Sequence, residues 1–102
     1  MSDDVSIIDD AAAGRYRLML GGEEIGVAEY DAIADSSVLV KHVEVLPAHE
    51  GKGYGSRLVR HVLDDIRARK LSVVPICAYT LAFIRKHPEY TGLVRDDMRN
   101  SL

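Results

Sequence analysis

The chain has 102 residues, the length of one domain, and 47% of them are hydrophobic, enough for a modest core. Its 16 acidic residues outnumber the 13 basic ones, and the net charge of −3 provides no overall positive field for nucleic acid or anionic lipid. We therefore expect a single domain over residues 1–102 with no nucleic-acid and no membrane partner.

The cysteine content and the first residues of the chain indicate the cellular compartment of the protein. The only cysteine, Cys77, excludes an internal disulfide and a cysteine-only metal cluster, which favours a reducing compartment. The acidic start Met1-Ser2-Asp3-Asp4 resembles no secretion signal, and no apolar run behind it is long enough to span a membrane. The histidines are not at metal-ligand spacing. We expect a cytoplasmic protein without a metal, as a monomer or weak homodimer.

The first half of the chain predicts strands. Large apolar residues alternate with other residues from Arg15 to Leu20, which is the period of a half-buried strand, and we expect the first strand here. Gly21-Gly22 supplies a two-residue hairpin turn into a second strand over Glu23–Ile33. After the polar break Asp35-Ser36-Ser37, the β-branched run Val38–Val45 predicts a third strand. Three consecutive antiparallel strands are the simplest arrangement.

The second half predicts two helices with a strand between them. Apolar residues recur at three- and four-residue intervals from Gly53 to about Lys70, as in an amphipathic helix. Ser72–Ile76 is typical of a short buried strand, and Ala78–His87 predicts a second helix stopped by Pro88. Tyr90 then docks as an anchor, and the adjacent acids Asp64-Asp65 are expected on the solvated outer face of the first helix.

A strand, a glycine-rich turn, a helix and another strand form one crossover unit, so the strands 38–45 and 72–76 are expected to pair in parallel. The predicted class is α+β: a mixed, mostly antiparallel sheet with two main helices. The glycine-rich turn connects a central strand to the first long helix.

Glycines at positions 51, 53 and 55 permit a tight turn at a helix start, where amide N–H groups point outward at the positive end of the helix dipole. Lys52 adds a positive charge and Ser56 a hydroxyl donor, so the segment is suited to a phosphate group. The alternative is that the glycines only form a tight connection between strand and helix. Glycine spacing alone leaves both interpretations open.

Two common nucleotide sites are disfavoured. A P-loop requires Gly-Lys-Ser or Gly-Lys-Thr, but Gly51-Lys52 is followed by Gly53-Tyr54. A dinucleotide fingerprint requires a glycine where the chain has Leu58 and an acidic residue at the end of the next strand, where it has Ile76-Cys77.

The segment Val43–Val59, VEVLPAHEGKGYGSRLV, resembles the acetyl-CoA signature of the GNAT N-acetyltransferase superfamily: a strand, a short loop, Gln/Arg-x-x-Gly-x-Gly/Ala, and a helix. The later stretch Val73–Tyr90 is similar to a subgroup of small GNAT-like proteins predicted to be N-acetyltransferases. Together the two segments cover more than half of the chain in the right order.

The resemblance implies a compact GNAT-like fold and acetyl-CoA as cosubstrate. Backbone groups near Val43 and Val45 would pair with the pantetheine arm as with an added strand, and the turn would hold the diphosphate. The residues expected to bind coenzyme A are Val43, Val45, Gly51, Lys52, Gly53, Tyr54, Gly55 and Ser56.

The chain departs from the family pattern at three places. Glu50 stands where the signature usually has Gln or Arg, which puts a negative charge near the diphosphate. The tyrosine that donates a proton to the departing thiolate in many members aligns near Ile84. The final strand pair that shapes the acceptor pocket would come after Val94, where little chain follows, so an open acceptor surface is expected.

Three residues are candidates for catalysis. Cys77, at a helix start that favours thiolate, could take the acetyl group, line the thioester channel, or be a small core residue. Tyr79 could donate the proton instead of the missing tyrosine, or pair with Phe83 in the core. Glu44, with His42 on the same strand face, could accept the proton of the amine, although both could equally be solvated strand residues.

These observations predict an acetyl-CoA-dependent N-acetyltransferase in which an amine attacks the thioester directly within a ternary complex. The amine acceptor, a small molecule or a protein, is not identified by the sequence. The alternative is a non-catalytic coenzyme A-binding or interaction module, which the missing tyrosine and the short acceptor half favour.

Overall fold

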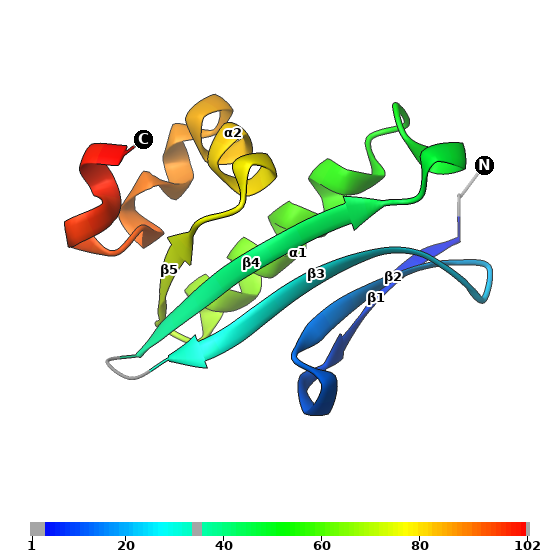
Figure 1. The fold of residues 1–102 in the computed structure, drawn as a ribbon, viewed down its shortest axis with the longest axis horizontal. Helices are drawn as coiled ribbons and strands as arrows, with labels where there is room; N and C mark the ends of the chain where they lie inside the picture. The colour runs from blue at the N-terminus through cyan, green and yellow to red at the C-terminus, as the bar shows by residue number, and fades with distance from the viewer. Residues whose placement is uncertain (1–3, 34–35, 102) are drawn as a thin grey trace.

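The computed structural model describes residues 4–33 and 36–101, so Met1–Asp3 and Asp35 of the expected polar break lie outside the described part. The strands are β1 (Val5–Asp10), β2 (Arg15–Leu20), β3 (Glu23–Ile33), β4 (Ser37–Val45) and β5 (Ser72–Pro75). The α-helices are α1 (Tyr54–Ala68) and α2 (Ala78–Lys86), and short 3-10 helices are η1 (Ala11–Ala13), η2 (Pro47–His49), η3 (Pro88–Leu93) and η4 (Asp96–Ser101). Figure 1 shows this arrangement.

The strands form one sheet in the order β1-β2-β3-β4-β5, antiparallel from β1 to β4 and parallel between β4 and β5. This confirms the α+β class, the three consecutive antiparallel strands and the parallel crossover pair. The turn at Gly21-Gly22 is also confirmed: both glycines have left-handed φ angles, 57° and 93°, which a two-residue hairpin turn of this hand requires.

The expectation that the first strand begins at Arg15 is wrong, because β1 precedes it and pairs along all of β2. Its side chains are only half-buried or exposed, and Ile8 is exposed, so the apolar pattern of this edge strand is weak. The strand conformation of β1 therefore depends on its pairing with β2 and not on its own sequence pattern.

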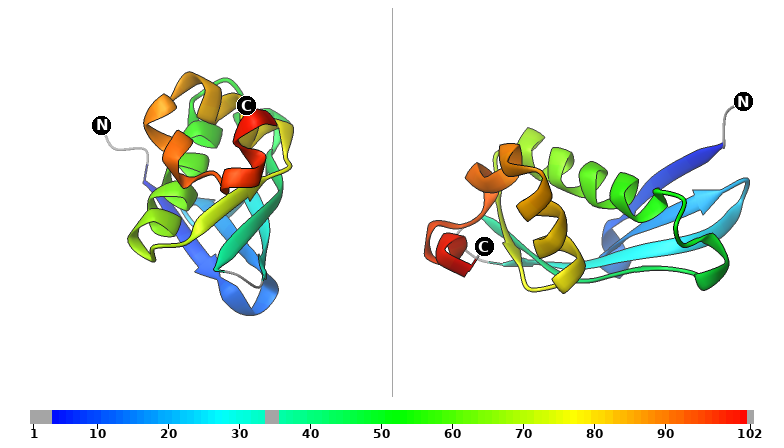
Figure 2. Two further views of the ribbon diagram at one scale, coloured as in Figure 1. Left: turned by 90° about the vertical axis from the view of Figure 1, so that its left-hand side faces the viewer. Right: turned by 90° about the horizontal axis from the view of Figure 1, so that it is seen from above.

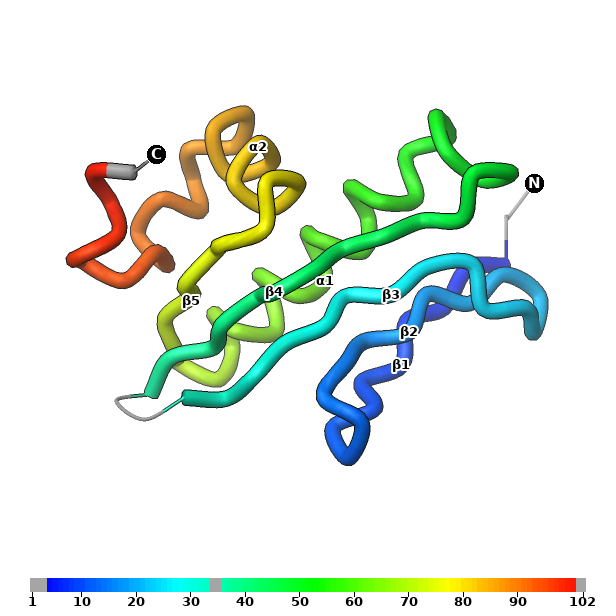
Figure 3. The backbone as a smooth tube through the Cα atoms, in the orientation of Figure 1, coloured from blue at the N-terminus to red at the C-terminus, as the bar shows by residue number. Residues whose placement is uncertain are grey.

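The β4–β5 ladder is short. It runs from the pair Ser37↔Ser72 to Val40↔Pro75 and stops there, while β4 continues to Val45 with β3 as its partner. Pro75 has no N–H to donate, and α2 begins three residues later, at Ala78. The two strands therefore diverge, as the tube in Figure 3 shows. The expected buried strand end at Ile76 is wrong, since this side chain is 55% exposed.

Helix α1 lies across one face of the sheet (Figure 2). The apolar stripe of α1 packs against apolar side chains of the sheet, and together they form the core. Its members include Leu58, Val59, Val62, Leu63 and Ile66 from α1 and Leu18, Ile25, Val40 and Val43 from the sheet. Helix α2 adds Phe83 and Ile84, and Tyr90 of η3 is buried beside them as the expected anchor. None of the helices within the described residues is long and apolar enough to cross a membrane.

Asp64 is exposed, as expected, and Asp65 is half-buried, but both acids also accept hydrogen bonds from tyrosines. The Tyr16 hydroxyl donates to Asp65 Oδ2 at 2.5 Å, and the Tyr90 hydroxyl donates to Asp64 Oδ1 at 2.7 Å. Arg69 also contacts Asp65, with Nε 3.2 Å from Oδ2. These acids accept hydrogen bonds from tyrosines whose rings are in the core, and so fix α1 to β2 and η3.

A second tyrosine at the same end of the sheet is held in the same way. The Tyr30 hydroxyl donates to Asp9 Oδ1 at 2.6 Å, and Arg69 Nη2 lies 3.0 Å from the other oxygen of Asp9. Burial, with the hydrogen bond to Asp9, raises the pKa of Tyr30 to about 12. Burial and the hydrogen bond to Asp65 raise the pKa of Tyr16 still further.

These shifts predict a loss of stability in alkali. Tyrosines of the unfolded chain titrate near pH 10, so their contribution is fully present below pH 10 and is lost as the pH rises through the higher folded pKa values. We expect the free energy of unfolding, measured by urea titration, to fall between pH 10 and 12. The double variant Tyr16→Phe/Tyr30→Phe should show a flatter pH dependence. An unchanged slope in that variant would contradict this account.

Candidate functional site

The loop between β4 and α1 adopts a conformation that two glycines make possible. Gly51 and Gly53 have φ angles of 79° and 83°, the left-handed region that L side chains rarely adopt. Gly53 is the N-cap of α1, and no side chain caps the helix start. The first amide N–H groups of α1 have no acceptor within the helix, and they lie at the positive end of its dipole.

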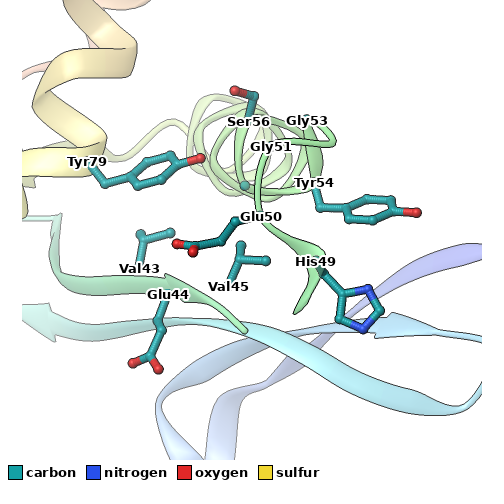
Figure 4. A pocket seen from close by; sticks show the side chains of 11 residues that line it. Val43, Glu44, Val45, His49, Glu50, Gly51, Gly53, Tyr54, Ser56 and Tyr79 are labelled. Atoms are coloured by element: carbon teal, nitrogen blue, oxygen red, sulfur yellow. The ribbon is translucent and has the colours of Figure 1, made fainter. Parts of the chain in front are cut away.

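A pocket of about 520 Å³ opens between this helix start and β4. Figure 4 shows the side chains around it. Its lining residues come from β4, the glycine loop, the first turn of α1 and the start of α2: Val43, Glu44, Val45, His49, Glu50, Gly51, Gly53, Tyr54, Gly55, Ser56 and Tyr79.

One wall of the pocket is the part of β4 that lies beyond the β5 ladder. Residues 42–45 pair with β3 on one side, after a register shift at Lys41, and have no strand partner among the described residues on the other, because β5 ends opposite Val40. Val43 and Val45 of this segment line the pocket. The site therefore combines an unpaired strand edge, which can accept an extended ligand, with a helix start that can accept an anion.

The structure gathers every residue expected to hold coenzyme A except Lys52, whose exposed side chain is not part of the lining. The lining also contains His49 and Glu50. Glu50 departs from the family pattern, as predicted, whereas no role was predicted for His49. The position of both residues directly before the first glycine is the sequence signal that places them in the lining. The His49 ring centroid lies 6.3 Å from that of Tyr54.

The three catalytic candidates lie at different places. Glu44 contributes to the pocket wall, but its carboxylate points across β4 to the other side, where Oε1 is 2.9 Å from His42 Nε2 (Figure 4). Both side chains are more than half exposed. Cys77 is the N-cap of α2, half-buried against the core, and does not line the pocket.

Tyr79 lines the pocket and is 42% exposed, whereas Phe83 is buried. Tyr79 is therefore not a core residue, although it lines a neighbouring recess together with Phe83. Ile84, which the resemblance aligns with the proton-donating tyrosine of many family members, is completely buried. Among residues 4–33 and 36–101, no group of three or more His, Cys, Asp or Glu side chains could hold a metal ion.

Comparison with known proteins agrees with this geometry. The model of the GCN5-related N-acetyltransferase family matches residues 15–93, and the chain belongs to this family. N-alpha-acetyltransferase 40 of Saccharomyces cerevisiae is 39% identical over 64 residues, which cover 60% of this chain. The match covers 22% of the yeast protein, so the chain spans about a fifth of that relative.

Solved structures share the fold. A GCN5-like protein of Staphylococcus aureus has a TM-score of 0.70 at 17% identity, over 93% of this chain and 91% of its own. The ribosomal-protein-S18-alanine N-acetyltransferase of Escherichia coli has a TM-score of 0.61 at 14% identity, over 84% and 53%. N-acetylglutamate synthase of Neisseria gonorrhoeae, solved with coenzyme A and N-acetyl-glutamate, has 0.60 at 18%, over 93% and 26%.

The left-handed loop predicts a contrast between two glycines. Gly53→Ala should lower the free energy of unfolding by about 1 kcal/mol, because the alanine is forced into a left-handed conformation. Gly92→Ala is the matched control: a Cβ there meets nothing within 4 Å and its φ is not left-handed, so the change should stay within about 0.5 kcal/mol. Urea unfolding measures both, and equal losses would contradict the assigned loop geometry.

Proposed function

We propose that this chain is an acetyl-CoA-dependent N-acetyltransferase that transfers acetyl to an amine by direct attack within a ternary complex. The observation that carries the proposal is the meeting of the unpaired β4 edge with the uncapped start of α1 in one pocket. These elements suit the two chemically different parts of coenzyme A, an amide-containing arm and a diphosphate. Family membership supports the same reaction.

In this proposal the diphosphate lies at the amides of residues 51–56, where the dipole of α1 and the nearby charge of Lys52 favour an anion. The pantetheine arm follows β4 at Val43 and Val45, whose backbone on this side faces no strand. The residues fit such a ligand in donor chemistry and in space. Glu50 opposes it electrostatically, because its carboxylate enters the same pocket (Figure 4).

The acetyl end then lies in the fork between β4 and β5, beside Cys77. The amine approaches from the face on which Glu44 and His42 lie, and Glu44 accepts the proton that the nitrogen loses as its bond to the acetyl carbon forms and the bond to sulfur breaks. His42 is in position to pass that proton on, since its ring contacts the carboxylate. In this scheme Cys77 takes no acetyl group.

The first test is binding followed by turnover. At about a hundred times its Kd, coenzyme A should add roughly 2.7 kcal/mol to stability, a rise of Tm on the order of ten degrees for a domain of this size. Gly53→Val should abolish the rise, and Gly92→Ala should keep it. A panel of amines, peptides and polyamines is then screened for acetyl-CoA-dependent thiol release.

The outcomes separate the two function classes. Thiol release with any amine supports the enzyme, whereas binding without release across the panel favours a non-catalytic coenzyme A-binding module. No Tm change and no calorimetric heat at millimolar coenzyme A would overturn both.

The proposed roles predict different effects of two substitutions. Glu44→Gln should lower kcat about a hundredfold, as expected for loss of a general base, with little change in KM for acetyl-CoA. Cys77→Ser should cost less than about tenfold, because the amine attacks the thioester without it. The kcat of His42→Gln is measured beside that of Glu44→Gln, because the His42 ring contacts the Glu44 carboxylate. A kinetically competent acetyl group on Cys77, detected by mass spectrometry, would show that the direct-attack scheme is wrong.

A further inference from the structure

Tyr79 lies on α2 but its side chain reaches across to α1. A Cβ atom placed on Gly55 would overlap the Tyr79 hydroxyl and would be 2.7 Å from Cζ, so the phenol rests on the first turn of α1. Gly55 is buried and has no left-handed φ angle. The requirement for glycine at position 55 is therefore space for Tyr79, not backbone conformation.

The phenol forms the boundary between two recesses. Tyr79 and Ser56 line the pocket at the glycine loop and also a neighbouring recess of about 250 Å³ formed by Ala82, Phe83, Lys86 and His87. Figure 4 shows the hydroxyl pointing toward the start of α1. Within residues 4–33 and 36–101 this hydroxyl has no hydrogen-bond partner. The half-exposed Tyr79 ring therefore positions a hydroxyl donor beside the first amides of α1.

Among the side chains that line the pocket, those of His49 and Tyr54 point away from the helix start in Figure 4, and Ser56 offers a hydroxyl on the first turn of α1. Glu50 can only accept hydrogen bonds when ionised, and Lys52 is not part of the lining. A phenol O–H can donate to a phosphate oxygen, and such a bond to a charged acceptor is stronger than one between neutral groups. Tyr79 is the aromatic hydroxyl in the pocket that points at the helix start, whereas the Tyr54 side chain points away from it (Figure 4).

We infer that the Tyr79 hydroxyl is a diphosphate ligand: it donates a hydrogen bond to coenzyme A from α2, opposite the amides of α1, and offsets the unfavourable Glu50. This inference rests on the proposed function. Tyr79 is assigned a binding role because its hydroxyl lies at Gly55, at the start of α1. The fork where β4 and β5 diverge is at a different place, beyond Val40 and Pro75. A proton donor to the thiolate would have to lie at that fork.

The test is calorimetric titration of coenzyme A into the wild type, Tyr79→Phe and the control Tyr30→Phe, whose hydroxyl donates to Asp9 outside the pocket. Loss of a hydrogen bond to a charged group predicts about tenfold weaker binding for Tyr79→Phe and a change below about twofold for Tyr30→Phe. Dephospho-coenzyme A, which keeps the diphosphate but lacks the 3′-phosphate, should show the same tenfold loss. A loss that disappears with dephospho-coenzyme A would place the hydroxyl at the 3′-phosphate and overturn the inference.

A second variant tests the contact through its other partner. Gly55→Ala must displace the phenol, so it should weaken binding about as much as Tyr79→Phe, and the two changes together should cost little more than either alone. Circular dichroism checks that the fold survives. Fully additive losses would mean that the alanine blocks the ligand directly and that Tyr79 does not act through this contact.

The failures are distinguishable. Wild-type protein that does not bind coenzyme A overturns the proposed function, and with it this inference. Wild-type protein that binds while Tyr79→Phe binds equally well overturns the inference alone. Unchanged binding with a lower kcat and a lost alkaline limb in the pH–rate profile would instead assign Tyr79 the role of proton donor.

Discussion

The architecture of the site depends on the early end of the parallel ladder between β4 and β5. The two strands pair over only four positions, from Ser37↔Ser72 to Val40↔Pro75, and then separate. Pro75 cannot donate an N–H, and the α2 helix begins soon afterwards, so the rest of β4 keeps one unpaired edge. An unpaired edge exposes backbone donors and acceptors that another extended chain can use. The pocket lies directly along this edge.

The packing that stabilises the domain also orients the anion-binding end. The apolar stripe of α1 is buried against the sheet, which fixes the helix axis and therefore the direction of its first amides. At its other end, α1 is tied by Asp64 and Asp65 to Tyr90 and Tyr16. A helix held along its length and at its C-terminal half keeps the loop of left-handed glycines at its start in a fixed position.

Much of this could be predicted because its causes are local. The period of two from Arg15 to Leu20, the turn at Gly21-Gly22 and the three- and four-residue spacing after Gly53 each encode an element through nearby residues. The order strand, glycine loop, helix, strand also fixes a right-handed crossover and hence a parallel pair. β1 was missed because a half-buried edge strand takes its order from β2, and Ile76 was misplaced because apolar character alone does not show where a ladder stops.

The sequence by itself determined the fold class, the glycine loop and the family, since these depend on spacing along the chain. Only the tertiary structure decided how residues distant in sequence meet. It placed the Tyr79 phenol on Gly55, directed tyrosine hydroxyls to Asp64 and Asp65, and set Glu44 on the face of β4 opposite the glycine loop. The physical reason is that side-chain direction across a sheet or between two helices depends on register and on helix rotation, which the packing of the whole core fixes and no short segment encodes.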